Sequence, residues 1–121
     1  MEQAIVSISK SKALLVEAKG DLEDERYNSA TVVAYLVLLN CSRALLFKDG
    51  YRERSHACVA RYLEVKYKNK IPQDFIMLLD HYRETRHDVQ YEPDFSAEAD
   101  GARQIVEFSD KFLKLVENLM K

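Results

Sequence analysis

The chain has 121 residues, with 18 lysines and arginines against 20 aspartates and glutamates, so its formal net charge is −2. This length predicts one domain, residues 1–121, large enough to bury a core without disulfides or a structural metal. The charge excludes a bulk attraction for nucleic acid, so any binding of RNA or DNA requires a local basic patch.

Glycine and proline are rare, with three and two residues. The stretches between them are rich in Ala, Leu, Glu and Lys, which favour helices. We therefore expect an all-α fold, an antiparallel up-and-down bundle of about five helices. Cys41 and Cys58 lie in apolar helical contexts without the paired spacing of a zinc site, so we expect reduced core cysteines and neither metal nor cofactor.

The first helix is expected over about residues 2–25, with an apolar stripe on one face. A second helix follows a cap at Asn28 or Ser29 and reaches Lys48, where Asp49-Gly50 forms a turn. This second helix is apolar nearly all round. Such a helix belongs at the centre of a bundle or partly in a subunit interface.

The densest apolar segment of the chain is residues 30–47, which polar residues such as Asn40 and Arg43 interrupt. It falls short of the roughly 20 apolar residues that span a bilayer. The N-terminus lacks a basic region followed by an apolar run, so it does not resemble a secretory signal. We expect a soluble cytoplasmic protein with no membrane partner.

Three further helices are expected in the second half of the chain. Ser55 can cap a helix that runs through about Tyr67, and Pro72 suits the first position of the next. That fourth helix ends before Pro93, and Ser96 is a suitable start for the last helix. All the connections are short enough for neighbouring helices to pack together.

The fourth helix carries the most unusual polar residues of the chain, over residues 81–91. Apolar residues recur there at helical spacing, and Arg86 falls on the same stripe. The stripe consists of Phe75, Leu78, Leu79, Tyr82 and Val89. Because burying a guanidinium is costly without a partner, Arg86 is expected to face a partner group, a cleft or a subunit interface.

Arg83, His87 and Tyr91 follow one another at intervals of four residues, so they project from one side of the fourth helix, with Gln90 between them. Together with Arg86, this cluster has the chemistry to hold a phosphate, with arginine supplying charge and an imidazole or phenol moving a proton. The alternative for Arg83 is a solvent-exposed pair with a neighbouring acid such as Asp80 or Glu84.

Other polar residues are weaker candidates. Arg43 and Asn40 interrupt the second helix and either face the cluster or serve capping and solvent-facing roles. His56 follows the cap residue of the third helix, where a neutral, hydrogen-bonding histidine is expected. Tyr35 is expected in the core. The sequence has no glycine-rich phosphate loop, zinc spacing or Gly-x-Ser-x-Gly motif.

Five segments, spread over nearly the whole chain, form a pattern that is typical of one family. These are Tyr27-Asn-Ser-Ala followed by Tyr35, Arg43-Ala-Leu-Leu, Gly50-Tyr, Ser55-His56, and Arg86-His87-Asp-Val-Gln-Tyr91. On these segments the chain resembles the HEPN family (higher eukaryotes and prokaryotes nucleotide-binding), and within it a small, poorly characterised prokaryotic subfamily.

The resemblance implies a dimeric helical domain, and many HEPN domains are metal-independent ribonucleases. Their motif is an arginine, a polar residue, three further residues and a histidine. Arg86 and His87 match the first two positions, and Tyr91 occupies the position of the catalytic histidine. The resemblance also implies a partner, because HEPN proteins are often encoded beside a minimal nucleotidyltransferase and act with it as toxin and antitoxin.

Three functions follow from these observations. The first is a dimeric nucleotide- or RNA-binding module paired with a minimal nucleotidyltransferase, with Arg83, Arg86, Gln90, Arg43 and His56 as binding residues. The second is a metal-independent endoribonuclease, with Arg86, His87 and Tyr91 as catalytic residues. The third is a purely structural helical dimer in which Arg86 forms a buried ion pair across the interface with an acid such as Asp88 or Glu92.

Overall fold

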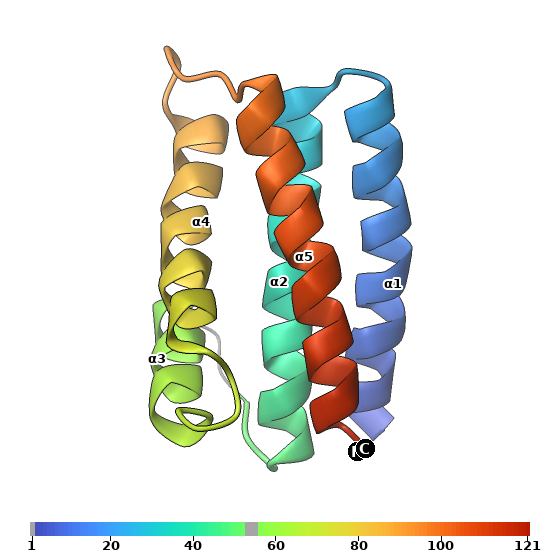
Figure 1. Ribbon diagram of the computed structural model, residues 1–121, viewed down its shortest axis with the longest axis vertical. Helices are drawn as coiled ribbons and strands as arrows, with labels where there is room; N and C mark the ends of the chain where they lie inside the picture. The colour runs from blue at the N-terminus through green and yellow to red at the C-terminus, as the bar shows by residue number, and fades with distance from the viewer. Residues whose placement is uncertain (1, 53–55) are drawn as a thin grey trace.

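The computed structural model describes residues 2–52 and 56–121, and for residues 56 and 57 it describes the backbone but not the side chains. The described residues form helices and no strand, so the predicted all-α class is confirmed. The helices are α1 (Glu2–Glu23), α2 (Tyr27–Lys48), α3 (His56–Lys66), α4 (Gln73–Tyr91) and α5 (Ala99–Leu119). Four long helices lie side by side, and the short α3 lies beside the lower half of α4 (Figure 1).

Helix α2 is the central helix of the bundle. It contacts α1, α3, α4 and α5, and most of its residues are buried. By length and composition alone α2 is long enough to cross a membrane, so the expectation that its apolar run is too short is wrong. Its apolar surface is instead covered by the other helices of the same chain, and the all-round hydrophobicity needs no subunit interface to explain it.

The start of α2 differs from the sequence prediction. The helix begins at Tyr27, and neither Asn28 nor Ser29 caps it. The Ser29 hydroxyl donates to Asp21 Oδ2 at 2.6 Å, and Asn28 Oδ1 accepts from the backbone N–H of Ala97 at 2.7 Å. Both side chains therefore tie α2 to other parts of the chain, and these tertiary partners outweigh the local capping preference.

The other helix ends agree with the sequence to within a few residues. Gly50 has a φ of +87° and follows α2, as the predicted Asp49-Gly50 turn requires. Pro72 is the residue before α4 rather than its first residue, and α5 begins after Glu98, so Ser96 does not cap it. The predicted cap at Ser55 lies outside the described residues.

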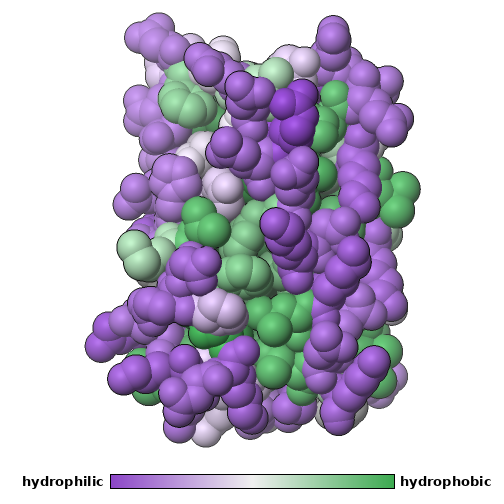
Figure 2. Space-filling model, in the orientation of Figure 1, coloured by the Kyte–Doolittle hydropathy of each residue, from purple (hydrophilic) through white to green (hydrophobic). Residues whose placement is uncertain are grey.

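Aromatic rings fix α4 against α5. The ring centroid of Phe108 on α5 lies 5.0 Å from that of Phe75 and 5.6 Å from that of Tyr82, both on α4. On the face shown in Figure 2, hydrophilic residues predominate, and hydrophobic residues are visible mainly between the helices and at one edge. Of the two cysteines, Cys41 is buried as expected, but Cys58 is exposed on α3, so its predicted core position is wrong.

Candidate functional site on α4

Helix α4 ends where the chain changes direction, and the polar cluster lies just before this end. Glu92 follows the helix with extended backbone, ψ 114°, because the residue before a proline avoids the helical region. The predicted apolar stripe is found on the inner side of the helix, where Leu79 and Tyr82 are buried. Arg86 continues this stripe and is partly buried, as its register predicted.

Arg86 packs on the ring of Tyr35 from the central helix. Its guanidinium carbon lies 5.1 Å from the Tyr35 ring centroid, and its Nη1 donates to Gln90 Oε1 at 2.7 Å. The ring face attracts the cation, and the amide one turn along α4 orients the planar guanidinium. The intramolecular partners that the sequence left unnamed for Arg86 are therefore an aromatic ring and an amide.

The hydroxyl of Tyr35 lies among arginines. Burial raises the pKa of Tyr35, and the charges of Arg86, Arg83 and Arg43, together with a hydrogen bond from Arg86, oppose this rise without cancelling it. Tyr35 is 4% exposed, so its expected core position is confirmed. The contact of Tyr35 with Arg86 could not be predicted, because the sequences of α2 and α4 do not show how the two helices are aligned along each other.

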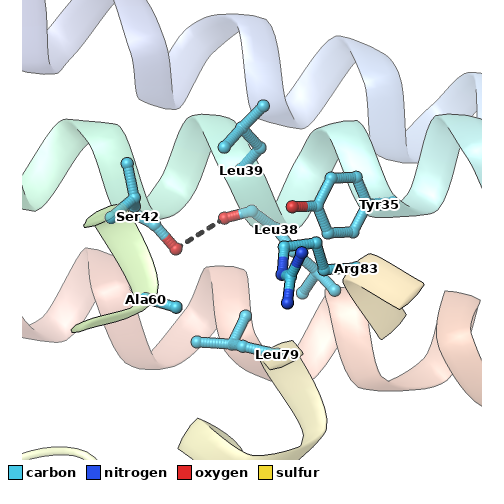
Figure 3. Close-up of a pocket in the computed structure, with 8 residues that line it drawn as sticks. Tyr35, Leu38, Leu39, Ser42, Ala60, Leu79 and Arg83 are labelled. Carbon is cyan, nitrogen blue, oxygen red and sulfur yellow. Dashed lines mark hydrogen bonds between the residues drawn. The ribbon is translucent and has the colours of Figure 1, made fainter. Parts of the chain in front are cut away.

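Arg83 lies one turn before Arg86 and bridges solvent and interior. Its Nη2 lies 2.9 Å from Asp80 Oδ1, so the predicted surface pair with Asp80 is present. Its side chain also lines a cavity of about 20 Å³ between α2, α3 and α4, where it meets Tyr35 (Figure 3). Ser42, across this cavity, donates its hydroxyl to Leu38 O at 2.8 Å. A space of this size holds about one water molecule and no larger ligand.

His87 and Tyr91 form the exposed part of the site. Their ring centroids lie 4.9 Å apart, as the spacing of four residues predicted, and Tyr91 is 64% exposed. An open hollow of about 330 Å³ lies over Arg83 and His87, with Glu84 and Asp88 beside them. The imidazole and the phenol are thus accessible to a large ligand, while the two carboxylates reduce the positive potential around Arg83.

Of the two candidate residues on α2, Arg43 belongs to the cluster around Tyr35 and Asn40 does not. Arg43 is partly buried, and its Nε is buried without a hydrogen-bond partner among the described residues. Its charge reaches Tyr35 and so belongs to the same basic cluster. Asn40 instead donates Nδ2 to Leu36 O at 2.8 Å within its own helix, which removes it from the cluster. The side chain of His56 lies outside the described residues.

One group of residues has the donor atoms for a metal ion. His87, Asp88 and Glu92 each offer a ligand atom, and these atoms lie within 4.8 Å of one another at the C-terminal end of α4. All three are at least partly exposed, and such groups are common on protein surfaces without any ion. The expectation that the protein uses no metal therefore stays a prediction.

Taken together, these features define an all-α fold in which Arg86 and Arg83 of α4 lie against Tyr35 of the central helix, with the rings of His87 and Tyr91 exposed beside them. The chain belongs to the HEPN family, because the sequence profile of the HEPN domain matches residues 6–119. The resemblance to the HEPN family is thus confirmed, and this family classes the protein among nucleotide- and RNA-related modules. A search of curated proteins finds no match.

Proposed function

We propose that this protein is a cytoplasmic RNA- or nucleotide-binding module that acts as a homodimer beside a minimal nucleotidyltransferase, in a system of the toxin–antitoxin type. The observation that carries the proposal is Arg86, which is held on the Tyr35 ring and by Gln90 at the position where the HEPN motif has its arginine. A guanidinium held in a defined plane can form two parallel hydrogen bonds to a phosphate.

The neighbours of Arg86 support the same ligand. Arg83 and Arg43 place two further positive charges around Tyr35. The three arginines together form a local basic patch, which a chain with a net charge of −2 needs in order to bind nucleic acid. His87 and Tyr91 project beyond them, with enough exposure to contact a base or sugar. Binding of a phosphate by the arginines and of a base by the rings is a common division of roles in RNA recognition.

A second function, metal-independent endoribonuclease activity, has one specific observation in its favour. His87 lies against Tyr91, the residue at the position of the family's catalytic histidine, so an imidazole is present within one helical turn of that position. In this mechanism Arg86 stabilises the charge that develops on the scissile phosphate and His87 moves the proton. Tyrosine itself is a poor base at neutral pH, because its ordinary pKa is about 10.

The first test is binding of labelled single-stranded RNA, measured by fluorescence anisotropy in the presence of a chelator. We expect Arg86→Ala to weaken binding about ten- to a hundredfold, since a hydrogen bond to a charged group contributes about 1.5–3 kcal/mol. Arg86→Lys should recover only part of the affinity, because lysine keeps the charge but cannot form the planar bidentate contact. The same samples report cleavage, which would establish the ribonuclease.

The matched control is Arg103→Ala on α5. Arg103 is exposed and forms an ordinary surface pair with Asp100 at 2.9 Å, so its loss changes the net charge equally without touching the site. Equal binding by the Arg86 and Arg103 variants would contradict the proposal. If Arg86→Ala lowers the melting temperature or dissociates a dimer while RNA binding was never present, the purely structural function is correct.

A further inference from the structure

A second cluster of polar and aromatic side chains lies at the opposite end of the bundle from Tyr91. There α2 ends, and the later part of α3 lies beside it (Figure 1). Three tyrosines, three lysines and one aspartate line a pocket of about 370 Å³ there. The aromatic and basic residues of this tyrosine–lysine pocket are Tyr51, Tyr62, Tyr67, Lys48, Lys66 and Lys70. None of them belongs to the site on α4.

A carboxylate holds two of the three rings in place. The hydroxyls of Tyr62 and Tyr67 both donate to Oδ2 of Asp49, each at 2.7 Å. Burial, followed by this hydrogen bond and the charge of Asp49, raises the pKa of both tyrosines, so the phenols stay protonated and the arrangement persists across the physiological range. The pocket wall is thus preorganised before any ligand arrives.

The open side of the pocket presents an aromatic surface. Tyr51 is 53% exposed, and its ring centroid lies 5.5 Å from that of the partly buried Tyr62. The Tyr67 ring lies 6.4 Å from Tyr62 and has the ammonium of Lys70 at 5.9 Å. An exposed ring beside a fixed one is a platform on which a nucleobase can stack without selecting its sequence.

The charge around this platform is positive. Lys48, Lys66 and Lys70 form no ion pair with any acid in the described parts of the chain, and they outnumber the single carboxylate of Asp49. The acid nearest to them along α3, Glu64, is paired with Arg61 at 3.8 Å. Lysines interleaved with aromatic rings match the alternation of phosphates and bases in a single strand.

We propose that the tyrosine–lysine pocket binds single-stranded RNA, with a base stacked on Tyr51 and phosphates held by Lys66 and Lys70. This inference rests on the proposed function only in taking RNA as the ligand, because the residues involved are separate from those on α4. The pocket gives the protein a second contact with the strand, and the two sites lie at opposite ends of the bundle.

The test measures the affinity of the whole protein for labelled oligouridine as a function of salt. We expect Tyr51→Ala to weaken binding about tenfold and Tyr51→Phe to leave it nearly unchanged, because stacking needs the ring and not the hydroxyl. Lys66→Ala with Lys70→Ala should lower the salt dependence of log K by about 0.7 for each lost phosphate contact. Lys10→Ala with Lys111→Ala, which removes two exposed lysines from α1 and α5, is the control for net charge.

The outcomes separate this inference from the proposed function. If Arg86→Ala weakens binding but the Tyr51 and Lys66/Lys70 variants behave like the lysine control, the pocket proposal is overturned and the α4 site stands. If the pocket variants weaken binding and Arg86→Ala does not, the reverse holds. A parent protein that binds no oligouridine, and whose Tyr51 and Tyr62 resonances do not move in NMR titrations with uridine monophosphate, overturns the pocket proposal directly.

Discussion

Arg86 is a charged residue whose partial burial is compensated by contacts with two neighbouring side chains. Its register on α4 sends the side chain toward the core, where an unpartnered guanidinium would be strongly destabilising. The Tyr35 ring offers an aromatic face and the Gln90 amide offers a hydrogen-bond acceptor. These two partners allow the arginine side chain to be partly buried. A residue fixed in this way can contact a ligand with little further loss of conformational freedom.

Tyr91 offers the sharpest test of catalysis at the residue scale. We expect Tyr91→His to increase the rate of RNA cleavage in chelator by at least about a hundredfold, because an imidazole with an ordinary pKa near 6.5 can exchange a proton at neutral pH. Cleavage of labelled RNA, followed on denaturing gels, measures this rate. Such a gain would show that the geometry around Arg86 is suited to catalysis and that only the proton-transfer group is missing.

Two variants control for this result. Tyr91→Gln introduces a polar side chain that does not titrate, so it should leave the rate at the level of the parent protein. Adding Arg86→Ala to Tyr91→His should abolish the gained activity, because the charge on the phosphate then lacks its partner. A Tyr91→His protein that cleaves no faster than the parent would mean that position 91 does not face a scissile phosphate.

At the level of the helices, side-chain hydrogen bonds tie the starts of α2 and α5 to other segments of the chain. Asp21 near the end of α1 accepts from Ser29 and from Arg26 Nε, at 2.6 and 3.2 Å, and this network closes the turn into α2. Asn28 holds the segment before α5 through its contact with Ala97. Asn28 and Ser29, which the sequence suggests as helix caps, therefore form hydrogen bonds to other segments of the chain instead.

Substitution by alanine is expected to change the stability of the protein in opposite directions at Gly50 and Gly20. We expect Gly50→Ala to lower the free energy of unfolding by about 1 kcal/mol, because a side chain at a φ of +87° is strained even though the space around it is empty. Gly20→Ala, inside α1 and equally free of close neighbours, should raise it by up to about 1 kcal/mol. Urea unfolding of the two variants, compared with the parent, measures both effects.

The two results check each other. Because the added methyl group meets no atom within 4 Å at either position, packing cannot explain a difference in sign. A stabilising Gly50→Ala would mean that the turn after α2 adopts a different backbone conformation in solution. A destabilising Gly20→Ala would mean that α1 is not helical at this position.

At the scale of the whole molecule, the shortness of α3 exposes the site. α3 lies beside only the lower half of α4, so no helix of the described residues lies on that side of the upper half, which carries residues 86–91 (Figure 1). Two copies meeting at this uncovered side would bring two arginine clusters to one cleft, which is the arrangement that the proposed dimer requires. Tyr91, which is 64% exposed, lies on this uncovered part of α4.

We therefore expect the protein to sediment as a dimer, at twice the chain mass of 14.1 kDa, and Tyr91→Glu to dissociate it. A carboxylate placed in an apolar interface must lose its hydration without gaining a partner. Val16→Glu is the matched control, because Val16 is 73% exposed on α1, which packs against α2 and α5. Dissociation by the Val16 variant alone would place the interface on α1 and contradict a shared site.

The helices, the central position of α2 and the side of α4 that carries Arg83, His87 and Tyr91 could all be predicted from the amino-acid sequence. These features follow from short-range periodicity, in which each residue's place on its own helix is set by its neighbours along the chain. The ring contact between His87 and Tyr91 was predictable for the same reason.

The groups that meet across helices could not be predicted from the sequence. Several contacts join separate elements: that of Arg86 with Tyr35, those of Asn28 and Ser29, and those of Asp49 with Tyr62 and Tyr67. The exposure of Cys58 likewise depends on how α3 packs on the other helices. Such contacts depend on how helices slide and rotate against one another as their cores pack. That relative register is set by the summed packing of many side chains, and no single helix contains it.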